Sequence, residues 1–375
     1  MLQAAGWPHN DRLWGMIKVR VMTQADYDHV AAVLGRNGLT VASRDDWVSL
    51  WIANPFRDPA MDMGWVLEDA GGALVGTFGN LPLGYEWNGR PIRVAAAYAW
   101  AVDPAFRKDS VRLLRRYLRQ ARVDLLLTST ASSRVGEIFS AVRFEPVPHA
   151  DYDRALLWVT RPQGFARAAL RQLGMPFADL LGYPVGLALG AIRRRSVARR
   201  SHLAANTARL TGFDARFDAF WKRLRQTPDR LLAVRTAGVL NWHFKRLLDL
   251  GQLVILGLEG QDALDGYLVM FRHDHAAIGL TRYRVADLQV LGDVRSGARQ
   301  LLEAALALAA DEGVHALEVI GLNAAKREAL APLSPRRRQL PSRLFYYRPL
   351  NPALTAPLRA VSAWDPSPFD GDASL

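Results

Sequence analysis

The chain has no cysteine among its 375 residues. This absence excludes disulfides, thiolate nucleophiles, zinc ribbons and cysteine-ligated clusters, and we expect no metal site. A secretion signal is also lacking, because residues 1–15 place Asp11 and Arg12 among Trp, Pro and His and contain no apolar stretch. We therefore expect a cytoplasmic protein whose residues 1–15 form an N-terminal extension.

Lysine is scarce, since only five of the 48 basic residues are lysine. The net charge is +12, and residues 161–250 account for all of it with 17 basic side chains against five aspartates. The codon composition of a gene can by itself enrich a protein in arginine and alanine. The charge alone therefore does not indicate an anionic partner. The arginines lack interleaved aromatic residues and no nucleic-acid-binding motif is present, which disfavours a nucleic-acid partner.

Length and composition indicate a globular protein of two domains, with 50% hydrophobic and 22% charged residues. Residues 349–375 hold five prolines among small and acidic residues, which predicts a flexible, poorly packed tail.

Hydrophobic periodicity predicts alternating strands and helices over the first 160 residues. The order is β-α-α-β-β-β-α-β, followed by one more helix and one more strand. The predicted strands are 17–22, 64–68, 73–78, 92–102, 123–127 and 156–159, and the predicted helices are 26–34, 44–52, 110–120 and 135–142.

The later half repeats this order. Ala73-Leu74-Val75-Gly76 has a counterpart 190 residues later in Ala263-Leu264-Asp265-Gly266, and residues 93–95 have one at 284–286. Several matches in the same order at nearly constant spacing predict a duplicated domain. The expected organisation is a first domain over 16–160, a basic bridging segment over 161–227 and a second domain over 228–348.

The element order resembles the GNAT acyltransferase superfamily. The stretch from Tyr98 to Arg107, which ends a long strand and runs into the next helix, and the stretch from Ile138 to Phe144 carry the resemblance. It implies an α/β (α+β) fold of two GNAT-like mixed-sheet domains joined by a basic, mainly helical bridge. It also implies acetyl-CoA or another acyl-CoA as co-substrate and a small-molecule acyl acceptor.

Family members hold the pyrophosphate of the co-substrate on backbone N–H groups between the fourth strand and the next helix. The resemblance places that site at the end of a strand and the start of a helix, and the implied residues are Ala101, Val102, Arg107, Lys108, Asp109, Ser110, Val111 and Arg112. Ser110 and Arg112 replace the two glycines of the family pattern. Three cations at a helix N-terminus suit phosphate, whereas Asp109 or Ser110 could instead cap the helix and occupy its donors.

Catalysis in this family uses a carboxylate-held water as base and a tyrosine as proton donor to the leaving thiolate. The family tyrosine position is Phe139 here, so the candidates for the acid are Tyr98 and Tyr152, each of which could instead be a packed ring. Asp287 stands in an otherwise apolar strand of the second half. A carboxylate at such a position is either used in chemistry or paired, with Arg282 or Arg284 as the expected partners.

The bridging segment contains an apolar stretch, residues 174–192, with Asp179 as its single charge. Pro184 and three glycines interrupt this stretch, so it is not expected to span a membrane. Arg193, Arg194, Arg195, Arg199 and Arg200 follow it, a pattern that fits either peripheral contact of 174–200 with an anionic membrane or a bridging helix with solvated arginines.

Two functions remain open at the level of sequence. The first is an acyl-CoA-dependent acyltransferase that acts on an amine or hydroxyl of a small molecule, sugar or lipid-linked precursor. The second is a catalytically silent tandem module that keeps the fold for binding or scaffolding. The missing glycines and tyrosine favour the second, and the intact element order and basic loop favour the first. The oligomeric state is open.

Overall fold

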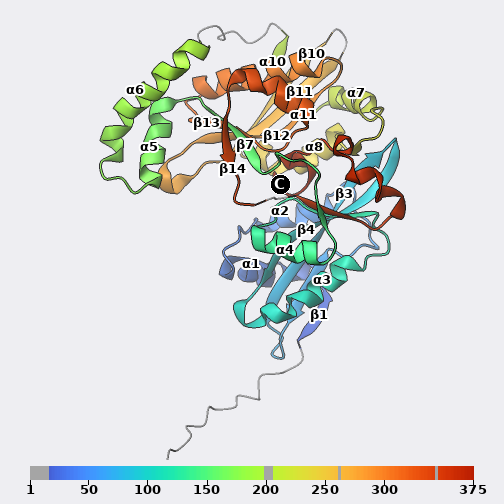
Figure 1. Ribbon diagram of the computed structural model, residues 1–375. Coiled ribbons are helices and arrows are strands. Elements are labelled where there is room, and N and C mark those ends of the chain that lie inside the picture. The colour runs from blue at the N-terminus through green and yellow to red at the C-terminus, as the bar shows by residue number, and fades with distance from the viewer. Residues whose placement is uncertain (1–16, 198–205, 261–262, 343–344) are drawn as a thin grey trace, which may run out of the picture. The chain divides into compact units, whose positions relative to one another are not determined.

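The computed structural model describes residues 17–197, 206–260, 263–342 and 345–375, and side chains are described outside 188–197 (Figure 1). The predicted N-terminal extension and the pair Arg199 and Arg200 lie outside these ranges. The described chain forms two compact units, one made of residues up to 82 together with 95–123, the other of 83–94 together with 124–375. The division falls within two long strands, at residues 82–83 and 94–95.

The first unit alternates strands and helices as the sequence predicts. Its strands are β1 (Lys18–Val21), β2 (Gly64–Glu68), and most of β3 (Leu74–Trp87) and β4 (Arg90–Val102). Its helices are η1 (Gln24–Asp26), α1 (Tyr27–Arg36), α2 (Arg44–Ile52), η2 (Pro104–Asp109) and α3 (Ser110–Leu118).

A cluster of aromatic and aliphatic side chains joins α1 and α2 to the sheet of the first unit. Trp47 and Trp51 are four residues apart on α2 and therefore face the same side, with ring centroids 5.1 Å apart. α2 begins at a Ser43 cap whose side chain accepts from the Asp46 N–H at 3.1 Å. On α3 the buried residues are Leu113, Leu114 and Tyr117.

The second unit contains the remaining elements. Its strands are β5 (Leu125–Thr128), β6 (Glu145–Pro146), β7 (Arg154–Val159), β8 (Thr207–Leu210), β9 (Leu231–Ala233), β10 (Leu253–Glu259), β11 (Leu264–Arg272), β12 (Arg282–Val290), β13 (Ala316–Val319), β14 (Arg336–Gln339) and β15 (Tyr346–Pro349). Its longer helices are α4 (Ser133–Ala141), α5 (Pro162–Gln172), α6 (Ala178–Val197), α7 (Ala215–Leu224), α8 (Ala237–His243), α9 (Lys245–Asp249), α10 (Val294–Asp311) and α11 (Ala324–Leu330).

The sheet that lies wholly in the second unit is mixed, with the order β14-β7-β13-β12-β11-β10-β8. The pair β12 and β13 is parallel and the other pairs of this sheet are antiparallel. α10 crosses from β12 to β13 and buries Leu301 and Leu302 against this sheet. It has 18 residues and begins after Asp293, whose side chain accepts from the Ser296 N–H.

Two strands depart from the predicted domain boundaries. β7 falls in the predicted first domain but pairs with β13 and β14 of the second sheet. β15 falls in the predicted second domain but lies between β5 and β6 of the other sheet. The boundaries at 160 and 348 are therefore corrected, because the residues of a short strand do not indicate which distant strand it pairs with.

The C-terminal segment, defined here as residues 363–375, is also unlike the predicted tail. Residues 363–371 are buried, and Trp364 packs on Tyr347 with ring centroids 4.7 Å apart. Phe369 packs on His243 at 4.6 Å. The prolines of this region fit short 3-10 turns such as Pro368–Asp370, and two large rings give it apolar area to bury.

α5 and α6 form a helical hairpin of the second unit, and the two helices run side by side in Figure 1. α6 continues through Pro184, which the sequence predicts to interrupt the stretch. Pro184 is exposed, so water can satisfy the carbonyl that its missing N–H leaves unpaired. Among the described residues, no helix combines the length and the apolar character that crossing a membrane requires.

Candidate functional site

The predicted phosphate-binding loop of the first unit is a continuous helical turn. η2 runs directly into α3, the Phe106 N–H donates to the Asp103 carbonyl at 2.9 Å, and the Ser110 N–H donates to the Arg107 carbonyl. The Ser110 hydroxyl donates to the same carbonyl at 2.6 Å. Asp109 precedes α3 without a side-chain cap hydrogen bond. These N–H groups are therefore used within the turn, and phosphate would rely on side-chain charge.

The three basic side chains of that loop have different surroundings. Arg107 and Lys108 are exposed on η2. Arg112 instead donates to the Ile17 carbonyl at 2.5 Å and lies 3.6 Å from the Asp109 carboxylate. Val111, which the resemblance places in the site, is 45% exposed and faces away from the helix's buried stripe.

The end of β4 leads into this turn. Ala101 and Val102 are buried, and the Asp103 N–H donates to the Val75 carbonyl at 2.9 Å. Ala99, three residues before Val102, has φ of 47°, a left-handed conformation that L-residues rarely adopt inside a strand. Such outliers recur beside functional sites, where they redirect a strand.

Tyr98 precedes Ala99 and is half-buried. Its ring lies edge-on to Trp51 with centroids 5.8 Å apart. It also leaves no room for a side chain at Gly79, where an added Cβ would lie 2.8 Å from the Tyr98 carbonyl oxygen. The ring is thus held in place by packing, while part of the residue stays accessible. The other tyrosine candidate, Tyr152, is buried in the second unit, and burial raises its pKa well above the ordinary value.

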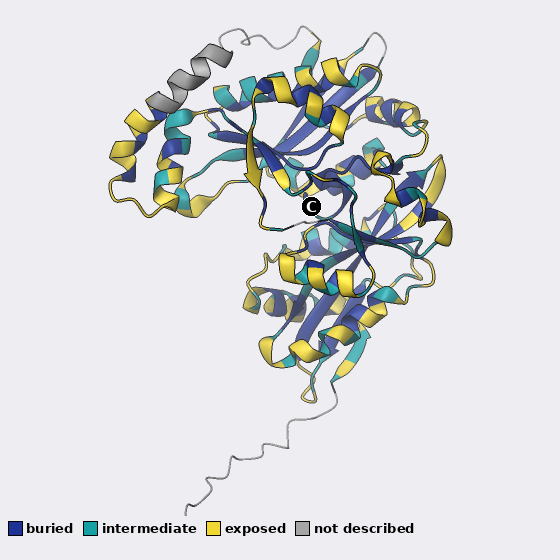
Figure 2. Cartoon of the chain, viewed as in Figure 1, coloured by how far each residue is buried: buried dark blue, intermediate teal, exposed yellow. Residues whose placement is uncertain are grey.

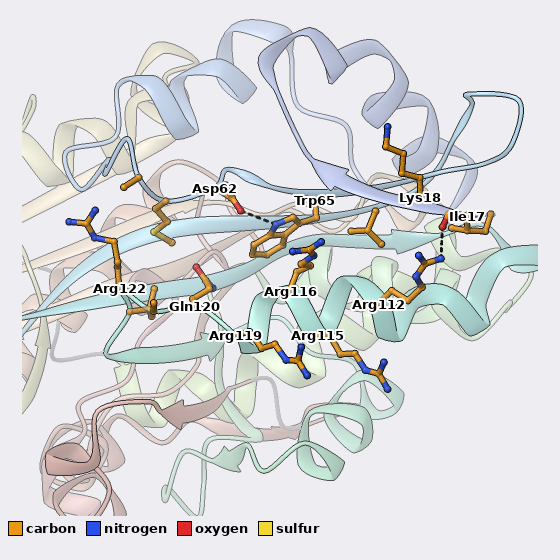
Figure 3. Close-up of a pocket in the computed structure, with 15 residues that line it drawn as sticks. Ile17, Lys18, Asp62, Trp65, Arg112, Arg115, Arg116, Arg119, Gln120 and Arg122 are labelled. Carbon is orange, nitrogen blue, oxygen red and sulfur yellow. Dashed lines mark hydrogen bonds between the residues drawn. The ribbon is translucent and has the colours of Figure 1, made fainter.

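A basic pocket of about 1070 Å³ opens between α3 and β1 of the first unit (Figure 3). We call it the arginine pocket, after the cations that line it: Lys18, Arg112, Arg115, Arg116, Arg119 and Arg122. The helical spacing of the α3 arginines places them on neighbouring turns. In Figure 3, Arg116 lies beside Trp65, whereas Arg115 and Arg119 point away from the strands.

Acidic groups offset little of this charge. Asp62 lines the arginine pocket, and its carboxylate accepts from the Trp65 indole N–H at 3.0 Å. Arg122 lies 3.6 Å from Asp58. Within the described part of the chain, Arg115, Arg116 and Arg119 have no ion pair, so an anion could bind there without displacing an internal partner.

The second predicted carboxylate, Asp287 on β12, is fully buried in the second unit. Arg235 donates from Nε to Asp287 Oδ2 at 2.8 Å, and the Tyr267 hydroxyl donates to the same oxygen at 2.7 Å. Gln289 and Ser367 donate to the other oxygen at 3.0 and 3.2 Å. Burial opposes ionisation, but the Arg235 guanidinium outweighs it and holds the pKa of Asp287 below its ordinary value.

Asp370 of the C-terminal segment shares the same arginine. Arg235 Nη2 lies 2.9 Å from Asp370 Oδ1, and its guanidinium carbon lies 4.8 Å from the centroid of the Phe369 ring. Burial raises the pKa of Asp370 to about 6 in spite of Arg235. The arginine is 1% exposed and Asp287 is 0% exposed, so this is an enclosed network of one cation and two carboxyl groups.

The expected partners of Asp287 pair elsewhere. Arg284 donates to Glu318 at 2.9 Å, and Arg282 lies 3.6 Å from the same carboxylate. The sequence prediction of a salt bridge to Asp287 was right in kind but wrong in the residue. Arg235 follows the buried strand β9 after Val234, and an arginine at the end of that apolar run was the available signal. Tyr98 and Asp287 belong to different units.

The described residues contain no group of three or more His, Asp or Glu side chains that could hold a metal ion. The arginine pocket and the turn beside it can bind an anion, and the Asp287 network can hold or transfer a proton only if its enclosure opens.

Comparison with known proteins gives a fold assignment. No family model and no curated protein matches the chain. Solved structures do: a GCN5-related N-acetyltransferase from Anabaena variabilis matches with a TM-score of 0.55 and 12% identity, covering 89% of this chain and 73% of that one. A probable N-acyltransferase from Enterococcus faecalis matches with a TM-score of 0.56 and 10% identity, covering 90% and 73%.

Saccharomyces cerevisiae N-myristoyltransferase with bound myristoyl-CoA matches with a TM-score of 0.54 and 10% identity, covering 89% of this chain and 79% of that one. Identities this low establish the fold and nothing finer. The chain therefore has the mixed α/β fold of the GCN5-related N-acetyltransferases, as its element order predicts.

Proposed function

We propose that this protein is an acyl-CoA-dependent acyltransferase. The observation that carries the proposal is its shared fold, over 89–90% of the chain, with N-acetyltransferases and with an N-myristoyltransferase that binds myristoyl-CoA. The argument is one of fold-level analogy, because a fold alone does not determine a function. The elements follow the same order in both halves, β2-β3-β4-α3-β5 in the first and β10-β11-β12-α10-β13 in the second. This repeated order supports our further proposal that the two halves are duplicated domains.

The first unit is our choice for the co-substrate site. The left-handed Ala99 in β4 and the exposed cations Arg107 and Lys108 stand on the segment where the resemblance places the pantetheine and the phosphates. Guanidinium and ammonium groups bind phosphate oxygens by charge-assisted hydrogen bonds, which compensates for the N–H groups used inside η2.

The reaction transfers an acyl group to an amine or hydroxyl of a small molecule. The acceptor attacks the thioester carbonyl, the new C–N or C–O bond forms, and the C–S bond breaks. The acceptor's proton passes to a base and the leaving thiolate takes one from an acid. We propose Tyr98 as that acid, because it is the half-buried tyrosine next to Ala99. If the second unit carries the reaction instead, Asp287 is our candidate carboxylate there.

Calorimetry with coenzyme A tests the location of the site. Replacing Arg107 and Lys108 together by Ala is expected to weaken binding by about tenfold or more, since two charge-assisted contacts to phosphate are lost. The matched control replaces Arg115 and Arg119 by Ala, which removes the same charge from α3. Loss of binding in the control alone would move the phosphates to the arginine pocket.

A thermal-shift screen with acetyl-, succinyl- and longer acyl-CoA tests the function itself. A ligand that binds only the folded state raises the melting temperature with its concentration. No shift with any acyl-CoA would contradict the proposal and favour a catalytically silent binding module. If shifts occur, Tyr98→Phe should lower kcat and alter its alkaline pH limb while the melting temperature stays unchanged, because the packed ring is retained.

A further inference from the structure

Exposed apolar side chains of the described chain are concentrated on one hairpin. Fourteen large hydrophobic residues are exposed, and eight of them lie between residues 173 and 187. Leu173, Phe177 and Leu180 are 75%, 78% and 74% exposed, at the connection between α5 and α6 and on the first turn of α6. Figure 2 shows this end of the hairpin mostly in the colour of exposed residues.

The packing of the hairpin explains why bulky residues of α6 face outward. An added Cβ at Gly186 would lie 2.5 Å from the Gln163 Cα, and one at Gly182 would lie 3.1 Å from the Arg167 Cα. These glycines are four residues apart, so one glycine face of α6 lies against the backbone of α5. The bulky residues between them are left on the other faces of α6, away from its partner helix.

The charged residues in the sequence of this segment are almost all basic. Residues 161–200 contain eight arginines and one acidic residue, Asp179. Asp179 is itself paired with Arg171 at 2.6 Å. Arg167 is exposed on α5, and the sequence of α6 continues into Arg193, Arg194 and Arg195. A second copy of the same basic hairpin would face it with like charge, which costs free energy.

We propose that the α5–α6 hairpin docks the protein on an anionic lipid surface, with Leu173, Phe177 and Leu180 inserted at the headgroup boundary. Apolar and aromatic residues beside a strongly basic segment are the composition of interfacial helices, which lie in the membrane surface without crossing it. The arginines supply attraction to anionic headgroups, and the apolar side chains supply burial in the acyl region. This inference is independent of the proposed catalytic activity.

Cosedimentation of the full chain with vesicles tests the proposal. Vesicles of phosphatidylcholine with phosphatidylglycerol should bind the protein, vesicles of phosphatidylcholine alone should bind it less, and rising salt should release it, because salt screens the charge attraction. Replacing Leu173, Phe177 and Leu180 together by Ser should weaken binding by about tenfold or more. The matched control replaces Leu250 and Val361, which are 53% and 55% exposed, by Ser and should bind as the unmodified protein does.

Three results would overturn the proposal. The first is failure to bind any vesicle at low salt. The second is equal binding by the Leu173, Phe177 and Leu180 variant, with unchanged circular dichroism. The third is a self-association of the unmodified protein, measured by sedimentation velocity, that the same variant abolishes, because the hairpin would then bind a second copy.

Discussion

Arg235 is the residue on which the buried charge of the second unit depends. It lies between the carboxyl groups of Asp287 and Asp370 and is 1% exposed. Removing one partner of a buried ion pair leaves uncompensated charge, which is more destabilising than the pair is stabilising. The network therefore acts as a structural tie between β12 and the C-terminal segment, whatever its catalytic role.

Replacing Arg235 by Met should destabilise the protein by roughly 3–5 kcal/mol, since two carboxyl groups lose their common cation. The free energy of unfolding in urea at neutral pH measures the effect. Arg209→Met is the control, because its ion pair with Glu312 at 2.9 Å is 55% exposed on the arginine side and should contribute about 1 kcal/mol or less. Equal losses in both variants would refute this view of the network.

His243 gives the protein an acid-sensitive position. Its Nε2 lies 2.8 Å from the Ser374 hydroxyl, and burial lowers the pKa of the imidazole to about 3. A base whose folded pKa is below its unfolded value of about 6.5 stabilises the fold above that value. This contribution is lost as pH falls from about 6.5 toward 3, by about 1.4 kcal/mol per pH unit at most.

The corresponding prediction compares His243→Gln with the unmodified protein from pH 7.5 to 4.5. The unmodified protein should have the larger free energy of unfolding at pH 7.5. The difference between the two proteins should decrease as pH falls, because glutamine does not titrate. Urea denaturation at each pH gives the free energies, and a gap that widens in acid would contradict the assignment.

Among the elements, the α5–α6 hairpin depends on close approach of two backbones. Gly186→Ala improves intrinsic helix propensity, yet its Cβ would meet the Gln163 Cα and N at 2.5 and 2.8 Å. We expect the clash to outweigh the gain in helix propensity, so that amide exchange in α5 and α6 becomes faster in this variant. Gly35→Ala on α1 is the matched control, because nothing lies within 4 Å of its Cβ, and it should stabilise the protein by up to about 1 kcal/mol.

Faster exchange confined to α5 and α6 in Gly186→Ala, beside unchanged or slower exchange in Gly35→Ala, would establish that the glycine face holds the hairpin together. Identical behaviour of the two variants would show that the helices separate easily. The outward orientation of Leu180 would then no longer follow from glycine packing.

Over the whole molecule, periodicity predicted local elements well and long-range partners poorly. Helix α2 was predicted with its observed bounds, because Trp47 and Trp51 are four residues apart and Asn54-Pro55 follows its end. The pairing of β7 and β15 with sheets of the opposite half was not predicted, since strand partners depend on three-dimensional contacts that no periodicity encodes. Asp287 was identified by its misplaced charge, but its partner Arg235 lies 52 residues away and carries no sequence link to it.

β7 and β15 each pair with strands of the other half of the chain, which predicts that the halves do not fold independently. A fragment of residues 17–150 contains β5 and β6 but lacks β15, which pairs with both, so β5 keeps an unpaired apolar edge. We expect this fragment to aggregate or to show fast amide exchange in β5. Fusing residues 345–364 to its end through a Gly-Ser linker restores β15 and the Trp364 ring that packs on Tyr347, and should recover protection there. Equal protection in the unfused fragment would show that β15 is dispensable, and the two halves would then be separable folding units.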